Sequence, residues 1–179
     1  IGSLLQFFFY GYSLIWLGVS IGMISLFINV QKEAAYVDIL SGLYNRQYFN
    51  NILLMHSKNG GAADALAGIM LDIDNLKSIN DRFGHAEGDE AISIAGRILR
   101  AAVGHQGVLC RLGGDEFIIL MHINSQKEIG ELVDIIKAQV TQFNESGKKP
   151  YEIHFSMGYS IYQNVHGSID DFIKKIDAS

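Results

Sequence analysis

The spacing of apolar residues predicts one long lipid-compatible helix followed by alternating helices and strands. From Ile1 to Gln31 the chain contains no Asp, Glu, Lys, Arg or His, and a helix needs about 20 mostly apolar residues to cross a bilayer. A cleaved signal peptide normally has a basic start and a shorter apolar run. We therefore expect a transmembrane helix over residues 1–30 and a linker over 31–37, the alternative being a buried helix of a soluble domain.

Beyond the linker, apolar residues recur with helical or strand-like periods. The expected helices cover residues 46–56 with Asn45 as cap, a stretch ending at Phe83, 89–103, a segment opened by a Ser125–Glu128 capping box, and a last one from Ser168. The expected strands cover 66–74, 108–112 and 116–123, with one or two further strands over 151–162. Gly113, Gly114 and Asp115 separate two of these strands, which predicts a hairpin. The mixture is typical of an α/β sandwich in which helices cover one sheet.

Composition narrows the classes of function. The formal net charge is -5, so no basic surface suggests a nucleic-acid partner. The single cysteine, Cys110, excludes an internal disulfide. Its place in an expected strand favours a small buried apolar residue over a reactive thiol.

Three carboxylates are the candidate chemistry. Asp72 lies near the end of a buried strand, and Asp115 and Glu116 lie at the hairpin turn. If these elements are neighbours, the acids converge, repel one another and favour a cation. Magnesium suits such oxygen ligands and binds together with phosphates, which predicts metal-assisted phosphoryl or nucleotidyl transfer. Phosphates are expected at the start of the helix after Asp74; taken singly, each acid is better explained as a solvated turn residue.

Four ordered segments resemble the motifs of one family. Residues Arg111–Phe117 read RLGGDEF, Asp38–Arg46 resemble a DxLTGLxNR opening, Asp72–Asp81 a DxDxFKxxND segment, and Phe83–Asp89 the pattern FGHxxGD. Over residues 37–178 the chain therefore resembles the GGDEF-domain diguanylate cyclases. The resemblance implies a mixed, mainly antiparallel sheet flanked by helices, similar to nucleotidyl cyclases and polymerase palms.

The resemblance also implies a role for each matching position. Asp72, the main-chain carbonyl of Ile73, and Asp115 would bind magnesium, two ions per site, with manganese as an alternative, and Glu116 would lie in the same metal environment. Asp115 would also accept the proton of the 3′-hydroxyl. The implied substrate-binding residues are Asn75, Leu76 and Lys77 at the phosphates, where Lys77 stabilises transition-state charge, and Asn80, Asp89 and the nearby His85 at the guanine.

Simple chemistry agrees with guanine recognition. An Asp carboxylate accepts hydrogen bonds from both N1–H and the exocyclic amine of guanine, whereas adenine would leave it unpaired. Outside the motif, Asp89 would be explained by the helix dipole and Asn80 by a turn.

The implied activity is the joining of two GTP molecules into cyclic di-GMP and two pyrophosphates. Each domain would hold one GTP, so a homodimer is expected, anchored by the N-terminal helix in the bacterial inner membrane with the domain facing the cytoplasm. The alternative is a catalytically inactive GTP-binding module with a regulatory role. A purely structural membrane-tethered dimerisation unit would explain none of the motif acids.

The sequence also departs from the family pattern. Gly104 and Gly107 stand where the family often carries an Arg-x-x-Asp product site, so we expect no product inhibition there. Leu76 replaces the usual Phe, and Ser41 the usual Thr. We expect a GGDEF domain over 38–179 that is truncated before the family's final helix, which would weaken GTP binding.

Overall fold

The computed structural model describes residues 2–58, 65–123 and 125–162, and the chain divides into the units Ile1–Tyr36 and Val37–Ser179. In the first unit, helix α1 spans Gly2–Ala34. Its segment Tyr12–Asn29 is long and apolar enough to cross a membrane and has no buried residue. The expected helix is confirmed, and its insertion into a membrane stays a prediction.

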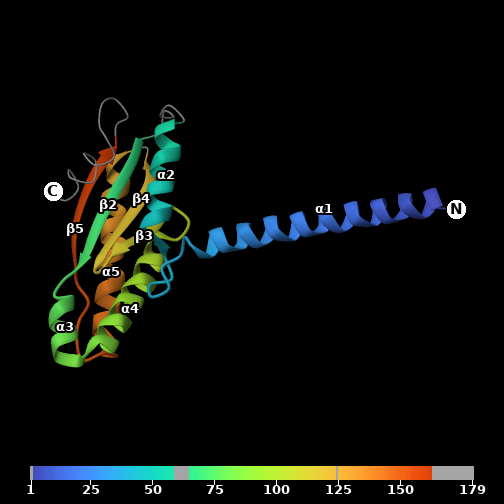
Figure 1. The fold of residues 1–179 in the computed structure, drawn as a ribbon. Helices are drawn as coiled ribbons and strands as arrows, with labels where there is room; N and C mark the ends of the chain where they lie inside the picture. Colours follow the sequence, from blue (N-terminus) through green and yellow to red (C-terminus); the bar gives the residue numbers. More distant parts are fainter. Residues whose placement is uncertain (1, 59–64, 124, 163–179) are drawn as a thin grey trace. The chain divides into compact units, whose positions relative to one another are not determined.

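The described residues of the second unit form one five-stranded sheet with the order β1-β3-β4-β2-β5 (Figure 1). The strands are β1 (Tyr44–Asn45), β2 (Ala65–Ile73), β3 (Val108–Gly113), β4 (Glu116–Ile123) and β5 (Phe155–Tyr162). Strands β1 and β3 are parallel, and the other three neighbouring pairs are antiparallel. The expected mixed, mainly antiparallel sheet is therefore confirmed, as is the β3–β4 hairpin.

Helices cover both faces of this sheet. They are α2 (Arg46–Lys58), α3 (Leu76–Phe83), α4 (His85–Val103) and α5 (Gln126–Glu145). Because successive strand residues point to opposite faces, Ile69 and Leu71 of β2 pack in the core with α4 and α5. Leu66 of the same strand packs with Phe49 and Leu53 of α2 in a second cluster. Helix α2 therefore lies across the sheet from α4 and α5 (Figure 1).

Both predicted helix caps are present. The side-chain oxygen of Asn45 accepts a hydrogen bond from the Tyr48 N–H at 3.1 Å, which satisfies a free donor at the start of α2. Ser125 and Glu128 form the expected capping box of α5. The predicted break at Asn59 and the predicted last helix from Ser168 lie outside the described residues.

The prediction that a helix begins at Asp89 is wrong. Helix α4 begins at His85, because Gly84 is both the last cap of α3 and the first cap of α4. The Gly84 N–H donates to the Asn80 carbonyl, while its own carbonyl accepts from the Glu87 N–H. Its φ of +88° is a conformation that glycine adopts without strain. The first turn of α4 is polar, so no apolar period marked it.

Cys110 is fully buried in β3. Burial raises the pKa of its thiol to about 12, so the sulfur stays protonated at neutral pH and is a poor nucleophile. The expectation of a small buried apolar residue is confirmed.

Candidate active site

Strand β2 and the β3–β4 turn bring the three predicted carboxylates together. In the antiparallel register, Asp72 lies opposite Glu116, and the Ile73 N–H donates to the main-chain carbonyl of Asp115 at 3.2 Å. Burial, followed by the negative charges of Asp115, Glu116 and Asp74, raises the pKa of Asp72. The acids are therefore close enough to repel one another, which a nearby cation would relieve.

The side chains nevertheless do not enclose a complete metal site. Among residues 2–58, 65–123 and 125–162, no three His, Cys, Asp or Glu side chains lie close enough to hold a metal ion. Glu116 forms an ion pair with Arg46 at 3.4 Å. Magnesium usually takes only one or two carboxylates and fills its octahedron with water and substrate phosphates. Asp72 and Asp115 are a donor set of that kind, so the residues present fit the ion.

Arg46 also fixes the strand that leads into the turn. Its Nε donates to the main-chain oxygen of Leu112 at 2.8 Å, while its Nη2 contacts Glu116. Both ion-pair side chains are at least half exposed, so the pair contributes little to stability. Its effect is to direct Glu116, and sequence reasoning assigned Arg46 no role.

Arg111 ties the turn to the segment that precedes β1. Its Nε and Nη2 donate to the Gly114 carbonyl at 2.9 and 2.7 Å, and its Nη1 donates to both carboxylate oxygens of Asp38 at 2.9 and 3.2 Å. Asp38 also accepts hydrogen bonds from the main-chain N–H and the hydroxyl of Ser41. Sequence reasoning quoted Asp38 and Arg111 as motif letters without a role; their opposite charges were the available signal.

The expected phosphate-binding segment begins with an unusual backbone conformation. Asn75 has φ 59° and ψ 26° and precedes helix α3, so the N–H groups that follow are oriented as in backbone anion sites. Asp74 holds this corner: its N–H donates to the His154 carbonyl at 3.0 Å, and its side chain accepts from the Ser156 hydroxyl at 2.7 Å.

The two residues after Asn75 differ in exposure. The side chain of Leu76 is buried in the core, which leaves only its main-chain N–H for a ligand. Lys77 is exposed, so its ammonium group is accessible from solvent. Replacement of the family's usual Phe by Leu76 therefore changes a core side chain and leaves the backbone N–H in place.

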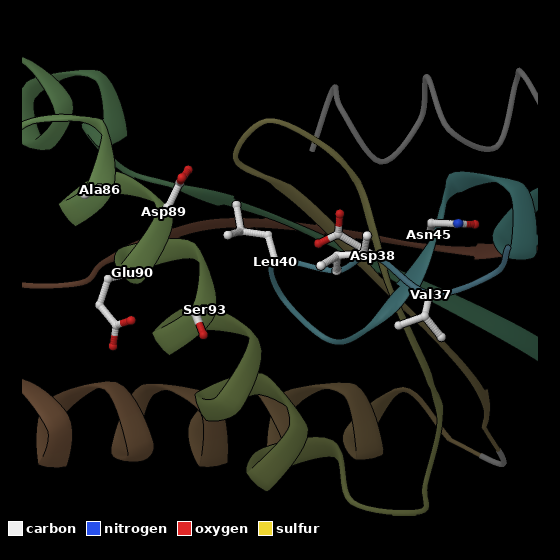
Figure 2. A pocket seen from close by; sticks show the side chains of 9 residues that line it. Val37, Asp38, Leu40, Asn45, Ala86, Asp89, Glu90 and Ser93 are labelled. Carbon is white, nitrogen blue, oxygen red and sulfur yellow. The ribbon is translucent and has the colours of Figure 1, made fainter. Parts of the chain in front are cut away.

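Asp89 lines a pocket of about 550 Å³. Figure 2 shows the pocket between α4 and the segment before α2. Its lining residues are Ala86, Asp89, Glu90 and Ser93 of α4, together with Val37, Asp38, Ile39, Leu40 and Asn45. Sequence reasoning found Asp89 and missed the opposite wall, because residues about 50 positions apart in the chain show no periodic relationship.

The other two predicted base-reading residues are not among the described residues that line this pocket. Asn80 lies on α3 directly against α4: a Cβ atom added to Gly88 would overlap the Asn80 side-chain oxygen and lie 2.7 Å from its Cγ. Asn80 is therefore next to the residue that precedes Asp89. His85 is exposed at the start of α4.

Residues 35–179 match the family described as "Diguanylate cyclase, GGDEF domain". The chain belongs to the GGDEF-domain family. Among curated relatives, it is 28% identical over 151 residues to Diguanylate cyclase A of Treponema denticola, covering 81% of this chain and 40% of the relative. It is also 28% identical over 144 residues to Cyclic di-GMP phosphodiesterase NbdA of Pseudomonas aeruginosa, covering 80% of this chain and 18% of that protein.

The fold of the GGDEF domain agrees with a solved structure. The chain superposes with a TM-score of 0.78, at 20% identity, on the coiled coil and GGDEF domain of DgcB from Caulobacter crescentus in complex with c-di-GMP, covering 92% of this chain and 88% of that one. The chain spans less than half the length of the two curated relatives. Their names include a cyclase and a phosphodiesterase, so activity has to be argued from this domain's own residues.

The structure describes Gly104 and Gly107, the two positions where the family often carries a product site and where none is expected here. Gly104 has a positive φ of 54° at the end of α4, and a Cβ added to Gly107 would lie 2.7 Å from the Leu120 carbonyl oxygen. Both glycines line a second pocket of about 410 Å³ with Tyr44, Arg100 and His105 among its walls. Position 107 therefore has no room for a side chain in this backbone arrangement.

Proposed function

We propose that this GGDEF domain is a diguanylate cyclase that joins two GTP molecules into cyclic di-GMP and two pyrophosphates. The observation that carries the proposal is that Asp72 lies opposite Glu116 in the sheet, close enough to Asp115 and Glu116 for their negative charges to raise its pKa. In each half-reaction the 3′-oxygen of one GTP forms a bond to the α-phosphorus of the other. The bond between that α-phosphorus and the oxygen bridging to the β-phosphate breaks, pyrophosphate leaves, and the hydroxyl proton passes to a base.

The residues of this chain divide that work between proton transfer and binding. Asp115 accepts the 3′-hydroxyl proton, because its carboxylate lies at the turn beside Asp72. The N–H groups of Asn75, Leu76 and Lys77 hold the phosphates at the start of α3, and the Lys77 ammonium stabilises charge that develops on them. Magnesium or manganese, held by Asp72, the Ile73 carbonyl and Asp115 with Glu116 beside them, would supply Lewis-acid activation when bound.

The guanine is read at the junction of α3 and α4. The Asp89 carboxylate accepts N1–H and the exocyclic amine, Asn80, which packs against Gly88, adds a hydrogen bond, and His85 lies nearby. Adenine cannot offer that pair of donors, so it makes fewer hydrogen bonds to the Asp89 carboxylate than guanine does.

The reaction requires two copies of the domain, because each holds one GTP. A homodimer in which the two sites face each other lets each 3′-hydroxyl reach the other α-phosphate. Helix α1 would anchor the protein in the bacterial inner membrane, with the GGDEF domain on the cytoplasmic side where GTP is present. The net charge of -5 does not favour a nucleic-acid partner.

A second candidate is a catalytically inactive module that binds GTP and regulates another activity. Two observations favour it: the ion pair of Glu116 with Arg46, which occupies a carboxylate expected at the metal, and the similarity to a protein named as a phosphodiesterase. In that case GTP would bind to the Asp89 pocket without turnover.

One experiment separates the two functions. The full chain, in detergent or nanodiscs, is incubated with GTP and magnesium, and nucleotides are separated by chromatography. We expect cyclic di-GMP from the wild type, none from Asp115→Asn, and a rate per enzyme that rises with enzyme concentration until the dimer saturates. GTP binding by calorimetry without product would support the regulatory module instead.

A further inference from the structure

Three side chains outside the proposed site join the segment after α5 to the beginning of α4. The Lys149 ammonium contacts the Glu87 carboxylate at 2.8 Å. The Tyr151 hydroxyl lies 3.1 Å from both the main-chain carbonyl and the carboxylate of Glu87. Since Glu87 is two residues before Asp89, these contacts act on the turn that carries the proposed guanine-binding carboxylate.

The Lys149–Glu87 ion pair is better shielded from solvent than the Arg46–Glu116 pair, although less so than the Arg111–Asp38 pair. The side chains of Lys149 and Glu87 are 22% and 37% exposed, against 61% and 50% for Arg46 and Glu116. Hydrogen bonds from Lys149 and Tyr151 lower the pKa of Glu87. Burial, followed by the bond to Glu87, raises the pKa of Tyr151 well above its usual value. The Glu87 side chain is therefore a carboxylate and Tyr151 a phenol across the neutral range, and the hydrogen bonds that this carboxylate accepts are charge-assisted.

Tyr151 also contacts the end of α3. Its ring packs against the ring of Phe83 at a centroid distance of 5.6 Å, and Phe83 is the last residue of α3. Tyr151 therefore touches both helices that meet at Gly84. Tyr151, which follows α5 in the chain, thus contacts both α3, the proposed phosphate-binding helix, and α4, the proposed base-reading helix.

The position of this turn is critical because Asn80 and Gly88 have no space between them. The Asn80 side chain lies so close to the backbone of α4 that a Cβ atom on Gly88 would force it to move. A shift of the turn by a few tenths of an ångström would change how far Asn80 stands from Asp89. Gly84 alone joins the two helices, so the covalent chain leaves their relative position adjustable.

We infer that Glu87, Lys149 and Tyr151 are positioning residues for nucleotide recognition: they hold the start of α4 against α3, so that Asn80 and Asp89 address the same guanine. This inference rests on the proposed function of the GTP site. It assigns the three residues no contact with substrate. Their effect passes through the main chain of residues 84–89.

The test uses Lys149→Met and Tyr151→Phe, singly and together, in the full chain. Each variant removes a hydrogen bond to a charged group, so we expect GTP affinity to fall and KM to rise about five- to tenfold per variant. The value of kcat should stay within about twofold of the wild type, because the acids at β2 are unchanged. Lys148→Met, at the neighbouring exposed lysine, is the matched control and should change neither constant. Exchanging the charges in Glu87→Lys with Lys149→Glu should recover most of the affinity.

A readout independent of turnover completes the test. Hydrogen exchange at the amides of residues 85–89 should be faster in the double variant and unchanged in the Lys148 control. Normal exchange there together with wild-type GTP affinity would overturn the inference, and so would equal losses of kcat, affinity and melting temperature. If the wild type binds GTP but makes no cyclic di-GMP, only the cyclase proposal fails, because affinity and exchange still decide the positioning role.

Discussion

The carboxylate of Asp38 receives two hydrogen bonds from Arg111, at 2.9 and 3.2 Å, across 73 positions of sequence. The same guanidinium holds the Gly114 carbonyl, so Asp38 reaches the residue before Asp115 through one side chain. Asp38 is also the second residue of the unit Val37–Ser179. The start of this unit is therefore connected directly to the turn that carries the proposed base.

Replacing Arg111 by Lys should uncouple that turn. A lysine ammonium cannot donate in a planar fork to Gly114 and Asp38 together, so we expect kcat to fall at least tenfold while GTP affinity changes less than threefold. Stability should drop by about 1–3 kcal/mol, the cost of leaving charged hydrogen-bonding groups unpaired. Kinetics and urea unfolding measure the two effects. Lys127→Arg, in the exposed pair with Glu131, is the control and should behave as wild type.

The Asp38 contact should also appear in the acid dependence of stability. Burial by itself raises the pKa of Asp38, but the hydrogen bonds from Ser41 and the Arg111 guanidinium outweigh it, and the net pKa is lowered. A lowered folded pKa stabilises the fold above the unfolded value of about 3.9 and loses that stabilisation as pH falls through the folded value. Urea unfolding from neutral pH to about pH 3 should therefore show a smaller loss in Asp38→Asn than in the wild type. Parallel curves for the two proteins would argue against this contribution.

Asn75 should tolerate glycine and reject a branched side chain. Its φ of 59° lies in the left-handed region, which costs an ordinary residue about 1–2 kcal/mol. We expect Asn75→Gly to unfold within about 0.5 kcal/mol of the wild type and Asn75→Val to lose about 2 kcal/mol or more. If the N–H groups that follow bind phosphate, Asn75→Gly should also keep GTP affinity. Equal stability of the two variants would contradict the backbone explanation.

Cyclic di-GMP at micromolar concentration should not inhibit this protein through residues 104–107. Two glycines occupy that segment, and Gly107 lies too close to the Leu120 carbonyl to carry a side chain. Building Gly104→Arg and Gly107→Asp should therefore not create a product site, and the second change should destabilise the domain by about 1–3 kcal/mol. Inhibition assays and thermal unfolding of both single variants are the measurements. Strong product inhibition of the wild type that Gly107→Ala abolished would show the opposite.

Local patterns predicted much of the fold, and long-range geometry supplied most of the site. The continuous apolar run around Ile69 located β2, and the Asn45 cap is a relationship between neighbours that spacing reveals. The start of α4 at His85 was missed because its first turn carries no apolar stripe. The pocket wall at Leu40 and the contact between Arg46 and Glu116 join residues that only the folded sheet brings together. The roles of the motif residues in catalysis stay predictions.

Gly84 ends helix α3 and begins helix α4, so the angle between the two helices depends on this one residue. The start of α3 would bind the phosphates and α4 would bind the base. The distance between these two binding positions would therefore depend on the conformation of Gly84. A molecule of the wrong length would strain that connection even where each end bound well on its own. Selectivity between nucleotides would thus depend on the angle between α3 and α4 as much as on any one side chain.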